Sequence, residues 1–234
     1  MLHELTSNPL FGLVLSIAIF LGSRTLAGWL KWPIFNPLIV SIVAVIAFLK
    51  ITGITYDDYY VGGSILNMLI APATVALAIP LYKSFHLLKH HARSIVSGII
   101  LGSLFSTLLT TCLAVLFKYD KSLVASILPR SVTTAIAIEI SSKMDGITTV
   151  TIIVVIITGI IGAITGPSIL RMARVDEPVA KGVALGTSAH AIGTARAMEL
   201  GTVEGAMSGL AIGVTGVVTV FIAPMMLKLF FLLT

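Results

Sequence analysis

Long apolar runs separated by short polar joints follow one another along the chain from residue 9 onward. A helix that crosses a membrane needs about 20 mostly apolar residues, because the hydrocarbon core is about 30 Å thick and each helical residue rises about 1.5 Å. Eight runs approach or exceed this length, and the joints are too short for an inserted soluble domain. We therefore predict a single integral membrane domain over residues 1–234. The runs cover residues 9–30, 34–52, 63–82, 93–117, 122–142, 147–170, 180–199 and 204–232.

Three of these runs contain residues that interrupt an α-helix. The third holds Pro72, Thr74 and Pro80, the fifth holds Pro129, and the seventh is rich in Gly, Thr and Ser. Proline removes a helical hydrogen bond at a cost of about 3 kcal/mol, and inside a membrane the freed carbonyl needs a protein partner or a water-filled cavity. Broken helices therefore indicate binding sites, although a simple packing kink produces the same pattern. The predicted fold is an all-α polytopic membrane protein with seven or eight transmembrane segments, some broken or re-entrant.

The distribution of Lys and Arg allows two topologies. One basic joint contains Lys89 and Arg93, another contains Arg171 and Arg174, and basic joints favour the cytoplasmic side. If all eight runs crossed the membrane, these two joints would lie on opposite sides. A fifth run that folds back at Pro129 would place both joints on one side. Eight crossings therefore compete with seven crossings and one re-entrant hairpin.

A weak internal similarity suggests an inverted repeat. Residues 98–106 align with residues 182–190, and residues 52–55 align with residues 145–148, but the two alignments need different offsets. Many secondary transporters enclose their site between the discontinuous helices of such repeats. Chance similarity between Gly-rich apolar segments is the alternative.

Composition excludes most other classes of protein. Only 11% of the residues are charged and 57% are hydrophobic, whereas soluble domains are roughly 25% charged, and the mean hydropathy is +1.07. The single cysteine, Cys112, allows neither a disulfide within the chain nor a thiolate metal site. The +5 net charge is spread between apolar runs, which argues against nucleic-acid binding. No phosphate-binding loop or hydrolase motif is found, so we expect no enzyme activity, no cofactor and no metal.

Arg130 is the most informative charge because it lies inside an apolar run. A charge at the bilayer centre costs at least about 2.5 to 3.5 kcal/mol, so it is retained for a reason. Arg130, Thr133 and Thr134 share one helical face beside Ser131. A guanidinium with neighbouring hydroxyls can bind a carboxylate through two hydrogen bonds. The alternative is that Arg130 extends from a helix end to the lipid headgroups.

The seventh run forms a second polar cluster. Thr187, His190 and Thr194 lie on one helical side, Ser188 is adjacent, and Gly193 allows close approach. Imidazole titrates near neutral pH, so His190 is the candidate for proton coupling, and a structural hydrogen-bonded histidine is the alternative.

Two further features are weaker. Arg196 lies just beyond this cluster, where it could meet a substrate anion, but Glu199 at i+3 could simply pair with it. Gly205, Gly209 and Gly213 recur every four residues, a spacing typical of close helix packing or a dimer contact.

The residues around these clusters resemble the LrgB/CidB family. The resemblance rests on Pro129–Thr134, on Gly186–Gly201 followed by Glu204–Gly209, and on Ala71–Tyr82, and it extends over nearly the whole chain. The family pattern has proline where this chain has Ala135, which predicts a more helical second half for the fifth run.

The resemblance implies two functions. Related proteins, including a plant plastid glycolate/glycerate translocator, move small 2-hydroxy or 2-keto monocarboxylates. This implies a carrier of pyruvate, glycolate or lactate, proton-linked or passive, that works by alternating access and affects autolysis indirectly. The alternative is a holin/antiholin-like regulator of murein hydrolases that assembles with a small LrgA/CidA-type membrane protein. Both interpretations imply a multi-pass protein of the bacterial cytoplasmic membrane, and we expect a homo-oligomer, such as a dimer.

Overall fold

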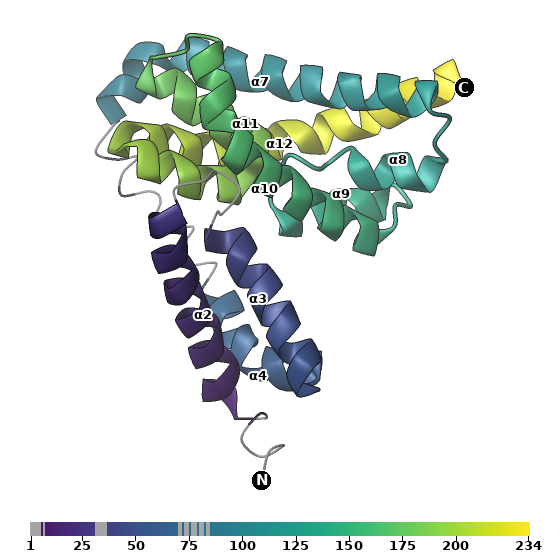
Figure 1. Cartoon of the computed structure of the whole chain (residues 1–234). Coiled ribbons are helices and arrows are strands. Elements are labelled where there is room, and N and C mark those ends of the chain that lie inside the picture. Colours follow the sequence, from purple (N-terminus) through teal and green to yellow (C-terminus); the bar gives the residue numbers. More distant parts are fainter. Residues whose placement is uncertain are drawn as a thin grey trace. The chain divides into compact units, whose positions relative to one another are not determined.

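The computed structural model describes residues 6, 8–30, 37–69, 72, 75, 79, 82 and 85–234. The chain divides into two compact units, Met1–Ala76 and Leu77–Thr234. Four helices are long and apolar enough to cross a membrane within the described ranges, and a shorter apolar helix covers Val40–Thr52. Every regular element in these ranges is a helix (Figure 1), which confirms the predicted all-α polytopic membrane fold.

The first unit is built around one long helix. Its helices are α2 (Pro9–Leu30), α3 (Pro37–Thr52) and α4 (Tyr56–Met68), and α2 packs against both others. Gly12 and Gly62 allow the closest approach, because a Cβ on either residue would collide with the opposite backbone. The Ser16 hydroxyl pairs with the Tyr59 hydroxyl at 2.8 Å.

Only part of the predicted third run lies in the described residues. Helix α4 starts at Tyr56, seven residues before the predicted boundary, because Thr55 caps its N-terminus by accepting a hydrogen bond from the Asp58 amide at 3.2 Å. Pro72 is helical and exposed. Thr74 and Pro80 lie outside the described residues.

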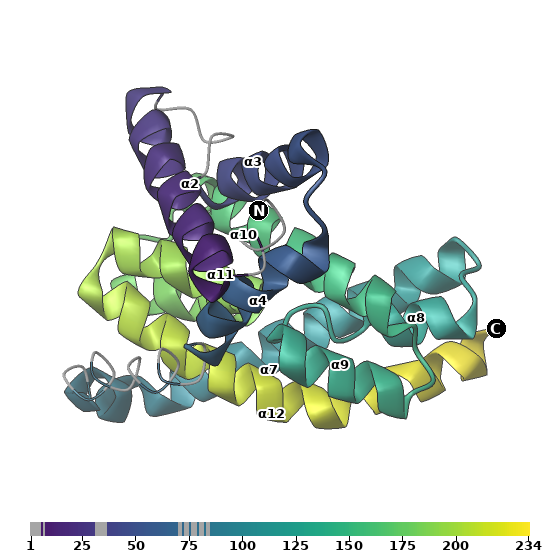
Figure 2. The same cartoon turned by 90° about the horizontal axis from the view of Figure 1, so that it is seen from below.

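The second unit consists of crossing helices and two folded-back pairs. Helices α7 and α12 run parallel and side by side (Figures 1 and 2). The helices are α7 (Phe85–Leu116), α8 (Lys121–Ile127), α9 (Thr134–Lys143), α10 (Thr148–Met172), α11 (Pro178–Leu200) and α12 (Thr202–Leu233).

Helices α8 and α9 form a re-entrant hairpin, hereafter hairpin 1 (residues 121–143). Its two ends meet, since the Lys121 ammonium lies 3.7 Å from the Asp145 carboxylate and the Ile147 amide donates to the Ser126 hydroxyl at 2.7 Å. With 7 and 10 residues, neither arm is long enough to cross a membrane. Of the two topologies that the sequence left open, these two short arms match the one in which the fifth run folds back at Pro129.

Helix α11 also folds back, and we call it hairpin 2 (residues 178–200). Ala189 and His190 leave the helical conformation, and His190 has φ 42° and ψ −135°. The first arm runs parallel to α12, with Gly182 against the Glu204 backbone. The second arm runs antiparallel to α12, with the Thr194 hydroxyl 2.7 Å from that of Ser208. The sequence predicted this seventh run as a crossing segment, whereas both of its ends lie at the start of α12.

The two hairpins belong to an inverted repeat. In each half a crossing helix, α7 or α10, leads into a folded-back hairpin. Both crossing helices end in a turn common at helix C-termini, which also ends α9 at Asp145: Lys118 has φ 54° and Arg174 has φ 55°, and the next residues, Tyr119 and Val175, each donate to a carbonyl five residues back at 2.9 Å. These positions are 56 residues apart (174 − 118). The structure thus supports an inverted repeat, but it replaces the predicted alignment of residues 98–106 with 182–190, because those segments are a crossing helix and a hairpin arm that lie side by side.

Both basic joints lie at one end of this unit. His91, near the start of α7, and Glu177, just before α11, line the same cavity. The joint after α10 therefore returns to the end of the unit at which α7 begins. Hairpin 1 adds no crossing between α7 and α10. The chain therefore crosses once in α7 and returns in α10 to the end at which α7 begins.

Candidate functional site

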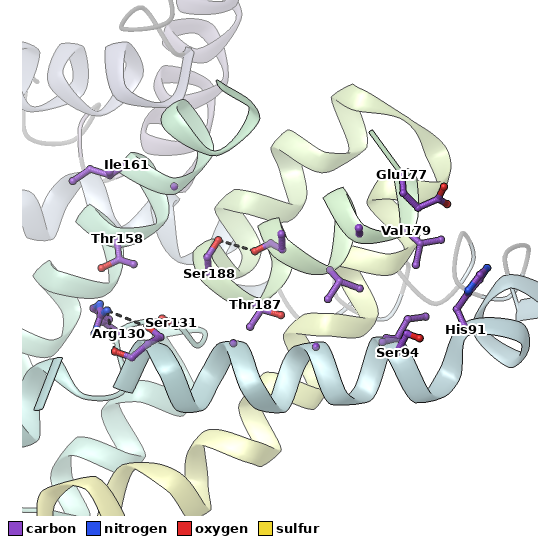
Figure 3. Close-up of a pocket in the computed structure, with 18 residues that line it drawn as sticks. His91, Ser94, Arg130, Ser131, Thr158, Ile161, Glu177, Val179, Thr187 and Ser188 are labelled. Carbon is purple, nitrogen blue, oxygen red and sulfur yellow. Dashed lines mark hydrogen bonds between the residues drawn. The ribbon is translucent and has the colours of Figure 1, made fainter. Parts of the chain in front are cut away.

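A cavity of about 810 Å³ lies in the second unit between α7, α10 and the two hairpins (Figure 3). Its walls are mostly apolar, with Ile95, Ile161 and Val183 among them. At its inner end Arg130 and Ser131 come from the bend of hairpin 1, while Thr187 and Ser188 come from the end of the first arm of hairpin 2. The bends of the two repeats therefore face one cavity.

Arg130 is fixed by the crossing helix α7. Its guanidinium donates hydrogen bonds to the Thr110 hydroxyl and, at 3.1 Å and 3.4 Å, to the hydroxyl and carbonyl of Ser106. The Ser131 hydroxyl lies 3.5 Å from that of Ser106. Arg130 is half-buried among the described residues and has no acidic partner there, so its positive charge remains available to an anion.

Thr187 presents a hydroxyl without a partner. Its side chain is 8% exposed, and its oxygen makes no hydrogen bond with the described residues. The neighbouring Ser188 hydroxyl is committed to the Ala184 carbonyl at 2.7 Å, although the oxygen can still accept. A buried hydroxyl without a partner costs about 1 to 3 kcal/mol, so its retention beside a cavity favours a bound ligand.

Three residues of the predicted second cluster, and Arg196 just beyond it, lie away from this cavity. The His190 Nε2 lies 3.0 Å from the Val155 carbonyl, and its ring packs against Gly159 of α10. Gly193 packs against Leu185, and the Thr194 hydroxyl bonds that of Ser208. Arg196 pairs with Glu199 near the outer end of hairpin 2.

The remaining predicted residues shape hairpin 1. Pro129 is fully buried at its bend, and Thr133 is the N-cap residue of α9. Thr133 and Thr134 are half-buried and do not line the cavity. Ala135 lies in the first turn of α9, which continues without a break to Lys143, as the absence of proline predicted.

Sequence reasoning missed the residues that hold Arg130. Ser106 and Thr110 lie in the middle of an apolar run, where a hydroxyl ordinarily bonds to its own helix; Thr110 does bond the Ser106 carbonyl at 2.8 Å. Thr158 of α10 also lines the cavity. The signal available was spacing: Ser103, Ser106 and Thr110 place hydroxyls at i, i+3 and i+7 along one side of α7.

The polar groups and apolar walls of the cavity suit a small organic anion. A cationic fork, a free hydroxyl and an apolar wall match a carboxylate attached to a short apolar group. In hairpin 2, Gly186 lies against Ser208 of α12 and Gly102 of α7 leaves room beside Thr187, so the bend can approach both helices closely.

Comparison with known proteins gives a consistent result over nearly the whole chain. A model of the LrgB-like family matches residues 16–229. A protein of Bacillus subtilis (strain 168) named "Antiholin-like protein LrgB" is 41% identical over 227 residues, which cover 97% of this chain and 98% of that protein. No solved structure matches.

Proposed function

The chain belongs to the LrgB-like family, and we propose that it is a carrier that moves small monocarboxylates such as pyruvate, glycolate or lactate across the bacterial cytoplasmic membrane. One observation carries the proposal: Arg130 and Thr187, whose buried hydroxyl has no hydrogen-bond partner among the described residues, line a single cavity from the bends of two oppositely directed hairpins. Sites between discontinuous helices of inverted repeats are typical of secondary transporters.

The chain's own groups would divide the work of binding. Arg130 would hold the carboxylate, with its side chain already oriented by Ser106 and Thr110. Thr187 would donate its hydrogen to a carboxylate, keto or hydroxyl oxygen, and Ser131 and Ser188 could accept from a 2-hydroxyl group. The apolar wall would limit the substrate to a short carbon chain, although one methylene changes binding by only about 1 to 3 kcal/mol.

A second candidate is an antiholin-like regulator of murein hydrolases. The name of the Bacillus subtilis relative, an antiholin-like protein, supports this candidate more directly than it supports a carrier. Such a regulator would act by assembling with a small LrgA/CidA-type membrane protein, and the extensive apolar surface of the crossing helices would permit assembly or a homodimer. The two functions are compatible if carboxylate flux influences autolysis.

Uptake by the purified protein in liposomes tests the carrier function. We expect saturable uptake of radiolabelled pyruvate or glycolate, and a loss of at least about tenfold in Arg130→Lys, because lysine keeps the charge but lacks the two-pronged fork. Arg196→Lys is the matched control, since Arg196 makes an exposed pair outside the cavity. Equal uptake in Arg130→Lys and wild type would contradict the proposed site.

The same assay separates the two candidates and tests His190. If the folded protein shows no uptake alone, addition of an LrgA/CidA-type chain decides between an obligatory partner and a purely regulatory assembly. Proton coupling through His190 stays a prediction, since its ring contacts Val155 and Gly159 and does not line the cavity. Uptake driven by a proton gradient should lose its gradient dependence in His190→Asn if this residue carries the proton.

A further inference from the structure

Arg130 lines a second, smaller cavity in addition to the cavity of about 810 Å³. This cavity has a volume of about 410 Å³ and lies between the end of α7, the first arm of hairpin 1 and the start of α10. Thr110, which accepts a hydrogen bond from the Arg130 guanidinium, lines this smaller cavity and not the larger one. Its walls include Tyr119, Leu123 and Ile127.

The two cavities reach toward opposite ends of the same crossing helix. His91 lines the larger cavity near the start of α7, and Phe117 lines the smaller cavity just after its end. Twenty-six residues (117 − 91) separate them, which corresponds to about 39 Å along a helix at 1.5 Å per residue. The intervening residues belong to a single candidate membrane span, Lys89–Leu116. Arg130 is the residue at which paths from the two ends would meet.

The inverted repeat relates the walls of these cavities. With the 56-residue spacing of the repeat, Leu123 and Ile127 of hairpin 1 correspond to Val179 and Val183 of hairpin 2. The first pair lines the smaller cavity and the second pair lines the larger one. Each half of the repeat therefore contributes an equivalent hairpin arm to one cavity.

We propose that the smaller cavity is the second vestibule of the transport path, through which the same small monocarboxylate reaches Arg130 from the opposite side of the membrane. This inference rests on the proposed carrier function. The basic joints at the His91 end, with Arg93 and Arg171, favour the cytoplasmic side, so the larger cavity opens to the cytoplasm and the smaller one to the outside. The hydrogen bonds of Arg130 to Ser106 and Thr110 lie between the two vestibules.

Accessibility of introduced cysteines tests this path. Cys112→Ser provides the background, Leu123→Cys probes the smaller cavity and Val183→Cys probes the larger one. A membrane-impermeant, negatively charged methanethiosulfonate is added to intact cells and, separately, to inside-out vesicles. We expect Leu123→Cys to react at least tenfold faster in cells, Val183→Cys at least tenfold faster in vesicles, and pyruvate to slow both reactions.

Matched controls make each outcome decisive. Leu109 lies on an exposed apolar face of α7 and lines neither cavity. The charged reagent does not enter lipid, so Leu109→Cys should stay unreactive in both preparations. The repeat-related pair Ile127→Cys and Val179→Cys repeats the test should either first variant fail to fold. A cysteine at Leu123 that is as unreactive as the control, or that reacts from the same side as Val183→Cys, would overturn the second vestibule. Labelling from opposite sides without pyruvate protection would instead support both vestibules while contradicting the proposed substrate.

Discussion

The Ser106 hydroxyl lies 3.1 Å from the Arg130 guanidinium, so a residue in the middle of crossing helix α7 holds the bend of hairpin 1. Thr110, one turn further along α7, accepts a second hydrogen bond from the same side chain. Without these contacts the guanidinium would be free to adopt other rotamers. The crossing helix therefore sets the position of the positive charge that faces the cavity.

Removal of the Thr110 hydroxyl should weaken substrate binding. In Thr110→Val, Arg130 loses an acceptor, and a hydrogen bond to a charged group is worth about 1.5 to 3 kcal/mol. We expect the KM for uptake to rise about tenfold or more with a smaller change in kcat, and Thr110→Ser, which keeps the hydroxyl, to restore it. Thr165→Val is the control, since the Thr165 hydroxyl donates to the Ile161 carbonyl of its own helix and Thr165 does not line the cavity. A KM unaffected by Thr110→Val would show that this contact does not position Arg130.

A methyl group added to Gly159 should destabilise the bend of hairpin 2. The new Cβ would lie 2.6 Å from the His190 Cε1 atom and 2.8 Å from the Ile192 side chain, which forces the ring from its bond with Val155. Overpacking of this kind costs about 1 to 3 kcal/mol. We expect Gly159→Ala to lower the unfolding temperature in detergent. Gly22→Ala, with nothing within 4 Å of its Cβ, should leave that temperature unchanged or raise it.

Hydropathy located the helices better than it located their directions. Hairpin 1, with its connecting bend, spans 23 residues (121–143), and α11 also has 23 residues, which equals the length of a crossing helix. Length alone could not distinguish a crossing from a fold-back. For hairpin 1 the basic joints raised a fold-back as one of two possible topologies. For hairpin 2 no pair of charged joints pointed to a fold-back, so the seventh run was predicted to cross.

The candidate site was predicted in part, and the errors have a common cause. Arg130 and Thr187 stood out because charge and small polar residues are costly in lipid. Thr194 was grouped with Thr187 and His190 by helical periodicity, and Arg196 was added because it follows closely in the sequence, but the conformation of His190, at φ 42°, reverses the chain and breaks that periodicity. A non-glycine residue with positive φ leaves no reliable mark in the sequence, so the residues after it were assigned to the wrong face.

The hydrogen bond between Thr194 and Ser208 should stabilise hairpin 2 against α12. The two oxygens are 2.7 Å apart, and both residues are almost fully buried. Interhelical hydrogen bonds in membrane proteins contribute about 0.6 kcal/mol on average and up to about 1.7 kcal/mol. We expect Thr194→Val and Ser208→Ala each to lower the free energy of unfolding, and the double variant to lose less than the sum. Strictly additive losses in a denaturant titration would contradict a direct contribution from this bond.

Removal of the Thr187 hydroxyl should raise stability, unlike removal of the Thr194 or Ser208 hydroxyl, and should at the same time lower uptake. Its buried hydroxyl has no partner among the described residues, so Thr187→Val removes a desolvated polar group and should raise the unfolding temperature. If that hydroxyl donates to the substrate, the same variant should lose uptake by about tenfold, the usual effect of one lost hydrogen bond to a charged ligand.

Ser103 and Thr215 provide the controls for this prediction, since their hydroxyls are also buried without partners in the described part of the chain but do not line the cavity. Ser103→Ala and Thr215→Val should therefore stabilise the protein and leave uptake unchanged. If all three variants kept full uptake, the Thr187 hydroxyl would not contact the substrate. If Thr187→Val lowered stability as well as uptake, the hydroxyl would have a structural role, because removal of a buried hydroxyl that makes no hydrogen bond should raise stability.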